Sequence, residues 1–371
     1  MLSSIPDTLT RLPSQHDLFL TWNVSSPSHF VPYVSILCPT YNHADLVSDA
    51  ISGFLSQVCT YPFEIIFRDD ASTDGTADIL RALQCRYPDI VRLIINDSND
   101  FHLGIWKSFF DLYDAARGAI IAFCEGDDYW RDPRKLQVQV DLLRENGFIS
   151  FSFTNCQDLL VNGRLVDGSF HSLSSSYTPS DVLRGKVLPM CTIAFRKNDL
   201  TLDPHMRSSP CLDVFIQSSL AALGPSVNAR LDIPCVYRVH SNGVWSGAPS
   251  ELRFRMIVTT LASLMSFFYS TGNPYAAWLT LLRLLDYIPS EAMRSGPSDF
   301  IAVSSVGLSS LLPEKLRDND SPAKGVSLVR VLRLLVLQRL RVAVTNLRLR
   351  LSVVTIRLLL PNLKIVYAPK R

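Results

Sequence analysis

Several signals that would place this chain in a familiar class are missing from it. No two of its eight cysteines form a Cys-x-x-Cys pair, and several lie inside apolar segments, which predicts free buried thiols in a reducing compartment. No G-x-G-x-x-G sequence follows the first expected strand, which disfavours a dinucleotide-binding oxidoreductase. The first residues include Asp7 and Arg11 and lack an apolar run of about 7 to 15 residues, so we expect no secretory signal.

Uninterrupted apolar runs of membrane-spanning length are also missing. No charged residue occurs from residue 256 to residue 282, but Gly272-Asn273-Pro274 divides this stretch into pieces of 16 and 8 residues. Both are shorter than the roughly 20 residues that a membrane helix requires, which favours a helical hairpin packed on the protein. With 371 residues, of which 47% are apolar, the chain can build a globular protein with a sizeable core.

The most informative feature that is present is a pair of carboxylates directly after an apolar run. Residues 119 to 123 are typical of a buried strand, and Pro133 with the periodic apolar residues after it predicts the start of a helix. Asp127 and Asp128 therefore lie at the carboxyl end of a strand, where ligands bind in open α/β sheets and where carboxylates suit a divalent cation carrying a phosphate. A solvated acidic turn that caps the helix has the same pattern, and both interpretations stay open on these residues alone.

A second acidic turn occupies an equivalent position. Asp69 and Asp70 follow the apolar segment 63 to 67, and the hydroxyl and carboxyl side chains after them can cap the next helix. An N-cap needs one acceptor, so both aspartates remain available to accept from a nucleobase N–H group. Because strands and helices alternate over the first 150 residues, the sequence predicts an α/β fold with a mostly parallel sheet and helices on both faces.

Three strings occur in one order along the chain: Ser-Ile-Leu-Cys-Pro-Thr-Tyr-Asn from residue 35, Asp-Asp-Ala-Ser-Thr-Asp-Gly-Thr from residue 69 and Glu-Gly-Asp-Asp-Tyr-Trp from residue 125. Together they resemble glycosyltransferase family 2. A further string, residues 236 to 246, is similar to the end of the catalytic domain in bacterial polysaccharide, capsule and O-antigen members. The resemblance implies a GT-A fold, with a Rossmann-like sheet flanked by helices and a C-terminal helical extension. It also implies a nucleotide-sugar donor, a divalent metal (Mg²⁺ or Mn²⁺) and inversion at the anomeric carbon.

The resemblance also implies which residues contact the nucleoside. Pro39, Thr40 and Tyr41 match the turn that lines the nucleoside. Asp69 or Asp70, with Asp70 slightly favoured, matches the carboxylate that binds the uracil or thymine edge. These residues form the first part of the expected nucleotide-sugar site.

Four further residues match the metal and diphosphate part of the family site. Asp127 matches a residue near the ribose, and Asp128 matches the ligand of the cation that bridges the diphosphate. His240 and Arg238 match a loop that closes on the diphosphate, where an imidazole can complete the metal shell and a guanidinium can fork to phosphate oxygens. Taken alone, this histidine and this arginine would be an ordinary loop residue and a solvated charge.

Asp213 falls where the family places its catalytic base, although the usual preceding Gly and following Trp are absent. A single Asp near the start of a helical pattern is also typical of an N-cap. The family reaction needs a carboxylate that deprotonates an incoming hydroxyl, and it needs no enzyme nucleophile because displacement occurs in one step. The resemblance favours the base over the cap.

The resulting hypothesis is a metal-dependent, inverting glycosyltransferase that moves a sugar from a UDP- or dTDP-linked donor to a hydroxyl of a polysaccharide or lipid-linked acceptor. The Gln-x-x-Arg-Trp sequence of processive cellulose and chitin synthases is absent, so we expect one sugar per encounter. The alternative is a non-catalytic nucleotide-sugar-binding or scaffold protein of a polysaccharide assembly system. Such a protein would be expected to lose Asp128, Asp213 or His240, and all three are present.

The expected domain organisation has three parts. Residues 1 to 30 are expected to be a poorly ordered extension, residues 31 to 246 the GT-A domain, and residues 247 to 371 a helical region with a basic tail. Within the GT-A domain, residues 31 to 150 form the nucleotide-sugar half. Residues 151 to 246 form the acceptor half, whose loops are rich in Ser, Gly and Asp.

The tail, residues 326 to 371, holds ten of the 36 basic residues and no acidic residue, so the remainder carries 26 − 34 = −8. This asymmetry predicts docking on anionic lipid, where each cation contributes about 1 kcal/mol. We therefore expect a cytoplasmic protein held peripherally at the inner face of the cell membrane. Nucleic-acid binding is disfavoured because no aromatic interleaving or groove-reading motif accompanies the charge.

Overall fold

The computed structural model of the chain describes residues 11–240, 243 and 245–295. Eight strands form the main sheet: β1 (Val34–Thr40), β2 (Phe63–Asp69), β3 (Val91–Ile95), β4 (Ile120–Phe123), β5 (Phe151–Phe153), β8 (Ser176–Tyr177), β9 (Ala194–Arg196) and β10 (Ser226–Asn228). Three more form a smaller sheet: β6 (Cys156–Leu160), β7 (Leu165–Val166) and β11 (Cys235–Val239).

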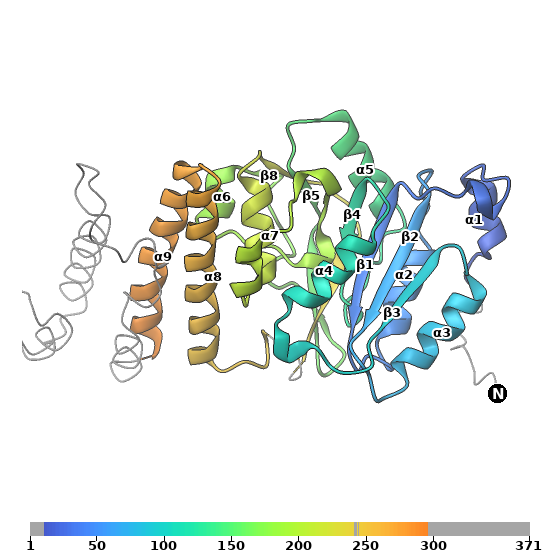
Figure 1. Cartoon of the computed structure of the whole chain (residues 1–371), viewed down its shortest axis with the longest axis horizontal. Helices are drawn as coiled ribbons and strands as arrows, with labels where there is room; N and C mark the ends of the chain where they lie inside the picture. Colours follow the sequence, from blue (N-terminus) through green and yellow to red (C-terminus); the bar gives the residue numbers. More distant parts are fainter. Residues whose placement is uncertain (1–10, 241–242, 244, 296–371) are drawn as a thin grey trace, which may run out of the picture. The chain divides into compact units, whose positions relative to one another are not determined.

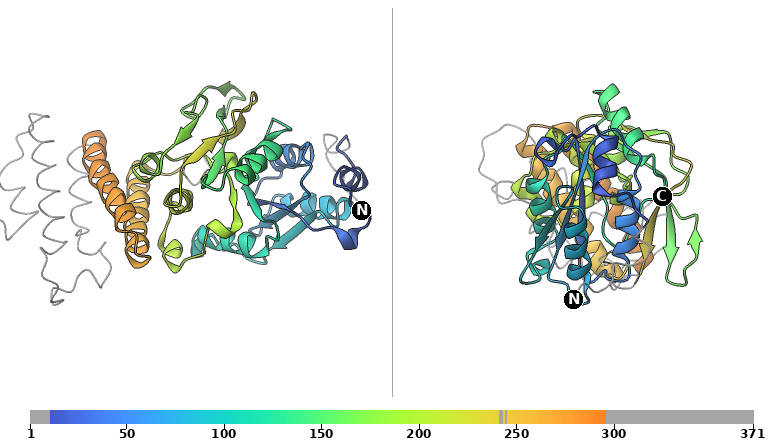
Figure 2. Two further views of the ribbon diagram at one scale, coloured as in Figure 1. Left: turned by 90° about the horizontal axis from the view of Figure 1, so that it is seen from above. Right: turned by 90° about the vertical axis from the view of Figure 1, so that its right-hand side faces the viewer.

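The α-helices are α1 (Gln15–Thr21), α2 (Val47–Leu55), α3 (Thr76–Arg86), α4 (Trp106–Ala115), α5 (Lys135–Glu145), α6 (Pro179–Leu183), α7 (Leu212–Ala221), α8 (Ser250–Ser270) and α9 (Pro274–Ser295). Short 3₁₀ turns connect them: η2 (Pro27–His29), η3 (Phe101–Leu103), η4 (Met190–Thr192), η5 (Lys197–Asp199) and η6 (Pro204–Ser208). Helices lie on both faces of the main sheet (Figures 1 and 2). The predicted α/β class with a mostly parallel sheet flanked by helices is confirmed.

The main sheet runs in the order β3-β2-β1-β4-β9-β5-β10-β8. β1 pairs in parallel with β2 and with β4, and β2 pairs in parallel with β3. β1 and β2 bury apolar side chains on both faces, as expected for parallel strands that helices cover on either side. Because parallel strands end at the same edge, the turns after β1, β2 and β4 meet there.

β2 carries charged side chains in its buried interior. Glu64, near its start, is fully buried and accepts hydrogen bonds from Ser35 Oγ at 2.7 Å and from Arg117 Nε at 2.8 Å. Arg68, near its end, is 1% exposed and forms ion pairs with three carboxylates. Both charges are compensated within the fold, as buried ions must be.

The second half of the predicted GT-A domain belongs to the same sheet. β9 lies between β4 and β5 and is antiparallel to both, and β10 is parallel to β5. The chain forms one compact unit up to Leu279, so the two predicted halves are not separate bodies. The small sheet continues toward the β4 turn, because Tyr129 and Val236 form an antiparallel bridge.

The expectation of a poorly ordered N-terminal extension is wrong for residues 11 to 30. α1 begins with a capping box in which Ser14 and Asp17 satisfy each other's backbone N–H groups. Trp22 and Phe30 are buried and stack at 5.8 Å, and Trp22 Nε1 donates to the Cys59 carbonyl at 3.0 Å. Four apolar side chains of this segment belong to the main core. The sequence did not reveal this packing, because many polar residues lie around these four positions. Residues 1–10 lie outside the described residues.

Within the described residues, the C-terminal region forms two helices, α8 and α9. α8 and α9 are separated at Gly272, whose φ of +74° suits glycine, and α8 packs on α7 and η6. Within the described part of the chain, no helix is long and apolar enough to cross a membrane. The basic tail lies outside the described residues.

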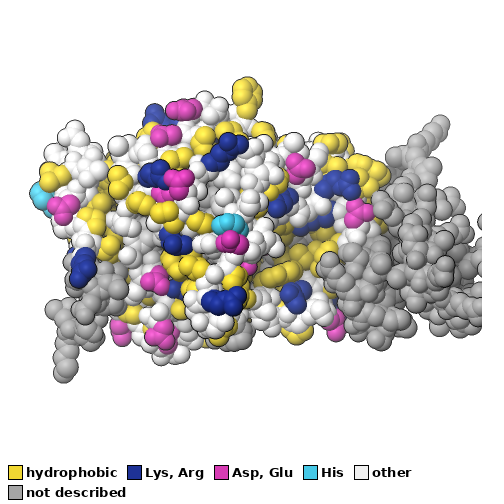
Figure 3. All heavy atoms as spheres, turned by 180° about the vertical axis from the view of Figure 1, so that it is seen from behind, with side chains coloured by type: hydrophobic (Ala, Val, Ile, Leu, Met, Phe, Trp, Pro, Cys, Tyr) yellow, Lys and Arg dark blue, Asp and Glu magenta, His cyan; other side chains and the backbone are white. Residues whose placement is uncertain are grey.

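Two smaller expectations concern thiols and surface charge. All eight cysteines are free, and all except the exposed Cys85 are buried, which confirms the prediction of buried free thiols at seven positions. On the face shown in Figure 3, acidic and basic side chains are interspersed, so this face offers no broad basic area of the kind that binds nucleic acid.

Candidate active site

The three turns predicted to carry chemistry are joined by backbone hydrogen bonds. The Asp70 N–H donates to the Thr40 carbonyl at 3.0 Å, and the Gly126 N–H donates to the Pro39 carbonyl at 3.0 Å. Thr40 is buried, and its Oγ1 donates to Asp69 Oδ1 at 3.0 Å. The ends of β1, β2 and β4 therefore form one continuous polar edge.

Gly126 allows the β4 turn to lie directly against the β1 turn. A Cβ at this position would lie 2.6 Å from Thr40 Cγ2 and 2.9 Å from His43 Nδ1. Real Cβ atoms do not approach other atoms so closely, so any side chain here would push the turns apart. The glycine between Glu125 and Asp127 is thus a packing requirement of the site.

Asp127 lies between two histidines. Its Oδ2 is 3.0 Å from His240 Nε2 and 3.8 Å from His43 Nε2. Burial opposes ionisation of Asp127, but the hydrogen bond from His240 and the charge of His43 outweigh it and lower the pKa of Asp127. The same hydrogen bond raises the pKa of His240, whereas burial lowers the pKa of His43, whose Nδ1 is buried without a hydrogen-bond partner among the described residues.

Asp128 has a different environment from its neighbour. Its side chain is 3% exposed, and Oδ1 accepts the Arg238 backbone N–H at 2.8 Å. Burial first, and then the charges of Asp127 and Glu125, raise the pKa of Asp128. The structure therefore places Asp127, not Asp128, against His240.

The Arg238 side chain is engaged within the protein. Its guanidinium donates to the Asp127 carbonyl and to the Asp49 carboxylate of α2, and it lies 4.7 Å from the centre of the Tyr129 ring. These contacts use two of the five N–H donors of the guanidinium, and the predicted fork from this arginine to a diphosphate stays a prediction. The arginine fastens β11 to the β4 turn and to α2.

Asp213 lies in the first turn of α7, and the N-cap of that helix is Cys211, which makes no side-chain capping bond. The charge of Asp213 contributes to raising the pKa of Glu125 to about 8, after the larger effects of burial and Asp127. The charge of the candidate base therefore acts on the β4 turn, and Asp213 is not the N-cap of α7. Glu125 Oε2 is buried without a hydrogen-bond partner among the described residues.

Asp69 and Asp70 have different partners. Both Asp69 oxygens accept hydrogen bonds, from Thr40 Oγ1, Ser72 Oγ and the Ser72 N–H. Asp70 uses Oδ1 alone, and no hydrogen bond to its Oδ2 occurs in the part of the chain that the structure describes. Asp69 connects two turns, whereas Asp70 leaves one oxygen without a hydrogen bond from the described residues.

Two more surfaces surround these turns. Tyr41 follows β1 and is 46% exposed, so its ring can cover a bound base or ribose. A hollow of about 420 Å³ opens beside Asp69, Ser72 and Asn96. No residue of the β4 turn lines this hollow, which lies at the ends of β2 and β3.

Comparisons with known proteins agree with this arrangement. Residues 35–197 match the model of glycosyl transferase family 2. A Mycobacterium tuberculosis protein, the uncharacterised Rv1520, is 31% identical over 263 residues, which cover 70% of each chain. This chain belongs to glycosyltransferase family 2. It is accordingly a glycosyltransferase enzyme, as predicted.

Two named relatives and one solved structure are similar to this glycosyltransferase. The putative teichuronic acid biosynthesis glycosyltransferase TuaG of Bacillus subtilis is 29% identical over 59% of this chain and 84% of its own length. The Escherichia coli UDP-Glc:alpha-D-GlcNAc-diphosphoundecaprenol beta-1,3-glucosyltransferase WfgD is 30% identical over 43% of this chain and 56% of its own. The crystal structure of Staphylococcus aureus TarS 1-349 with UDP-GlcNAc covers 85% of this chain and 91% of that one at 17% identity and a TM-score of 0.52, which shows the shared GT-A fold.

Sequence reasoning missed several residues of the glycosyltransferase site. Glu125 was within a quoted string and His43 directly follows another, and their signal was an ionisable side chain close to an assigned one. Arg68 also had a signal, since it is a basic residue at the end of an apolar strand. No sequence signal indicated the ion-pair partners of Arg68, which are Asp100 and Asp111, or that of Arg238, which is Asp49.

Proposed function

We propose that this glycosyltransferase is inverting and metal-dependent, and that it transfers one sugar per encounter from a UDP- or dTDP-linked donor to a hydroxyl of a polysaccharide or lipid-linked acceptor. The observation that carries the proposal is the contact of Asp127 with His240 at 3.0 Å, and the charge of Asp213 acts on Glu125 of the same turn. The names of TuaG and WfgD support a polysaccharide or lipid-diphosphate-linked acceptor.

The side chains present fit a divalent cation. Asp127 Oδ2 and His240 Nε2 are an oxygen and a nitrogen ligand 3.0 Å apart, and two adjacent ligands of an octahedral cation at about 2.1 Å lie about 3.0 Å apart. No group of three possible ligands occurs within the described residues, so diphosphate oxygens and water would complete the shell. We therefore assign Asp127 and His240 as ligands, and Asp128 to holding the β4 turn through Arg238. When bound, the cation neutralises charge on the leaving diphosphate.

In the proposed reaction Asp213 accepts the proton of the acceptor hydroxyl while that oxygen attacks the anomeric carbon from the face opposite the diphosphate. The new glycosidic C–O bond forms as the bond to the diphosphate oxygen breaks, so the configuration inverts. Asp70 Oδ2 accepts from the N–H edge of the base, and Tyr41 covers the nucleoside. In this proposal Asp213 acts from α7, Asp70 from the turn after β2 and Tyr41 from the turn after β1.

Donor hydrolysis tests this proposal without knowledge of the acceptor. Purified protein with Mn²⁺ is incubated with UDP-glucose, UDP-GlcNAc, dTDP-rhamnose, GDP-mannose and CDP-linked sugars, and released nucleotide is measured. We expect slow release from a uridine or thymidine donor that EDTA abolishes and that Asp127→Asn reduces. Release that is unaffected by EDTA contradicts metal dependence, and donor binding without any release favours the non-catalytic alternative.

A further inference from the structure

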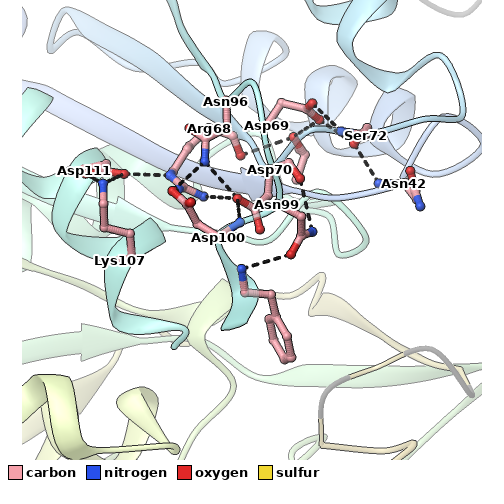
Figure 4. A network of polar contacts seen from close by, with 12 residues as sticks. Asn42, Arg68, Asp69, Asp70, Ser72, Asn96, Asn99, Asp100, Lys107 and Asp111 are labelled. Atoms are coloured by element: carbon pink, nitrogen blue, oxygen red, sulfur yellow. Dashed lines mark hydrogen bonds and ion pairs between the residues drawn. The ribbon is translucent and has the colours of Figure 1, made fainter. Parts of the chain in front are cut away.

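Arg68 lies near the end of β2 and contacts carboxylates from three segments (Figure 4). Its Nη1 lies 2.9 Å from Asp70 Oδ1, its Nη2 2.9 Å from Asp100 Oδ2, and its Nε 2.9 Å from Asp111 Oδ2. Asp70 follows β2, Asp100 precedes η3, and Asp111 belongs to α4. One buried guanidinium thus joins the end of β2 to the two elements beside it.

In Asp70, one of the two carboxylate oxygens accepts all of the side chain's hydrogen bonds from the described residues. Its Oδ1 accepts from Arg68 Nη1, from Asn96 Nδ2 at 2.9 Å and from the Asp100 N–H at 3.0 Å. Three donors on one oxygen fix the plane of the carboxylate. The side chain is 13% exposed, and Oδ2 has no hydrogen bond among the described residues, so that oxygen is open to a ligand and has a fixed direction.

The formal charge of the cluster is also informative. Three carboxylates face Arg68, and Lys107 pairs with Asp111, so the cluster carries −3 + 2 = −1. If these two cations only stabilised the fold, one or two carboxylates would be enough to neutralise them, because each additional buried charge is costly. An excess negative charge next to an unpaired carboxylate oxygen suits a ligand that donates a neutral N–H group.

We propose that Arg68 is a positioning residue for donor selection, which fixes Asp70 so that Oδ2 accepts from the N3–H group of a uracil or thymine base. The inference rests on the proposed function and deepens it. Cytosine presents an acceptor at N3 and would repel this oxygen, so the arrangement selects uridine or thymidine diphosphate donors over cytidine ones. Arg68 acts through Asp70 and need not touch the nucleotide.

β2 itself supplies a matched control. Glu64 at its other end is held by Arg117, whose Nε lies 2.8 Å from Glu64 Oε2. Arg68 belongs to this buried strand and Arg117 pairs with Glu64 of the same strand, but Arg117 lies at the edge opposite the three turns. Loss of Arg117 therefore tests the general cost of removing such an ion pair, apart from nucleotide recognition.

The experiment measures dissociation constants for UDP and for N3-methyl-UDP, which lacks the N–H, with Mn²⁺ present. Wild-type protein and Arg117→Met are expected to prefer UDP by about 10- to 100-fold, the value of a hydrogen bond to a charged group. In Arg68→Met the preference should fall below about threefold, and in Arg68→Lys it should be intermediate because a lysine cannot hold three carboxylates as a planar fork. General destabilisation would weaken both ligands together and leave their ratio unchanged.

The possible failures are distinguishable. If wild-type protein does not discriminate between the two ligands, the proposed contact of Asp70 with the base fails, and this inference fails with it. If wild-type protein discriminates and Arg68→Met discriminates equally, the inference on Arg68 is overturned while the proposed function stands. Should Arg68→Met not fold, Asp111→Asn loosens the same guanidinium, and an unchanged ratio in that variant overturns the inference while a reduced ratio supports it.

Discussion

His240 Nε2 lies 3.0 Å from Asp127 Oδ2, although 113 positions separate the two residues along the chain. Two connections bring them together. Tyr129 and Val236 form a backbone bridge, and the Arg238 N–H donates to Asp128 Oδ1 at 2.8 Å. Both connections lie just before His240 and just after Asp127 in the sequence, so β11, which His240 follows, is fastened to the β4 turn next to the contact, and the proposed ligand pair is preorganised.

The first prediction separates the two adjacent aspartates. Asp127→Asn should weaken Mn²⁺ binding in the presence of UDP by at least about tenfold, because a carboxylate ligand is lost. Asp128→Asn should leave Mn²⁺ affinity near the wild-type value, since an amide oxygen can still accept the Arg238 N–H. Mn²⁺ titration followed by electron paramagnetic resonance measures both.

A surface pair provides the control for this prediction. His171 and Asp167 also lie 3.0 Å apart, but both are exposed, and Asp167→Asn should not change Mn²⁺ binding. If Asp128→Asn loses the metal and Asp127→Asn keeps it, Asp128 is the ligand, as the sequence predicted.

The second prediction concerns the base. Asp213→Asn should lower kcat for transfer by about 100- to 10,000-fold, the usual contribution of a general base, while the UDP dissociation constant stays within about twofold. Asp203→Asn is the control, because Asp203 caps η6 through the His205 N–H at 2.8 Å, away from the reaction. Reduced stability of Asp213→Asn with normal turnover per folded molecule would refute the base assignment.

The third prediction is a pH dependence of stability in EDTA. Burial, then Asp127, raises the pKa of Glu125 to about 8, whereas the unfolded side chain titrates near about 4.3. Between these values the folded protein holds a proton that the unfolded chain has lost, so stability is present at low pH and falls as pH rises through this window. The slope for one proton is at most about 1.4 kcal/mol per pH unit.

Urea unfolding at pH 5, 6, 7 and 8 measures this slope. Glu125→Gln should make it shallower, and Asp128, whose pKa is also raised, should account for what remains. An identical slope in wild-type protein and Glu125→Gln would show that Glu125 is ionised in the folded state.

The fourth prediction concerns the tail, residues 326 to 371, with ten basic residues and no acid. Deleting it should release the protein from phosphatidylglycerol vesicles in a sedimentation assay while donor hydrolysis is retained. Salt near 1 M should mimic part of the release, because the Debye length falls to about 3 Å. An intact protein that ignores these vesicles at low salt, or a truncated one that precipitates, contradicts membrane docking.

The part of the fold that was predictable is the part with long-range regularity. Alternating apolar strands and amphipathic helices predicted the parallel strands, and the acidic turns after residues 69 and 123 were predicted to occupy equivalent positions at strand ends. The insertion of β9 between β4 and β5 was not predictable, because β9 and β5 have three residues each and no distinctive periodicity. α1 was missed because its buried face is one short turn of Leu18 and Phe19.

The site was predictable by region more than by residue. Sequence identified both acidic pairs, but it could not decide which member of each pair faces a ligand. That choice depends on turn geometry: Ala71 adopts a φ of +60°, which folds Ser72 back onto Asp69 and leaves Asp70 to Arg68. The partners of Arg238 were likewise unpredictable, because Asp49 is 189 positions away.

The charges at the two ends of β2 have a consequence for folding. Glu64 and Arg68 are four residues apart, so they project from the same face of the strand. Glu64 pairs there with Arg117, and Arg68 pairs with Asp111. A shift of β2 by one residue against β1 would turn both charges to the opposite face and separate them from these partners. The two ion pairs thus penalise misaligned assembly at both ends of a central strand, and they favour the single alignment in which the sugar-transfer site exists.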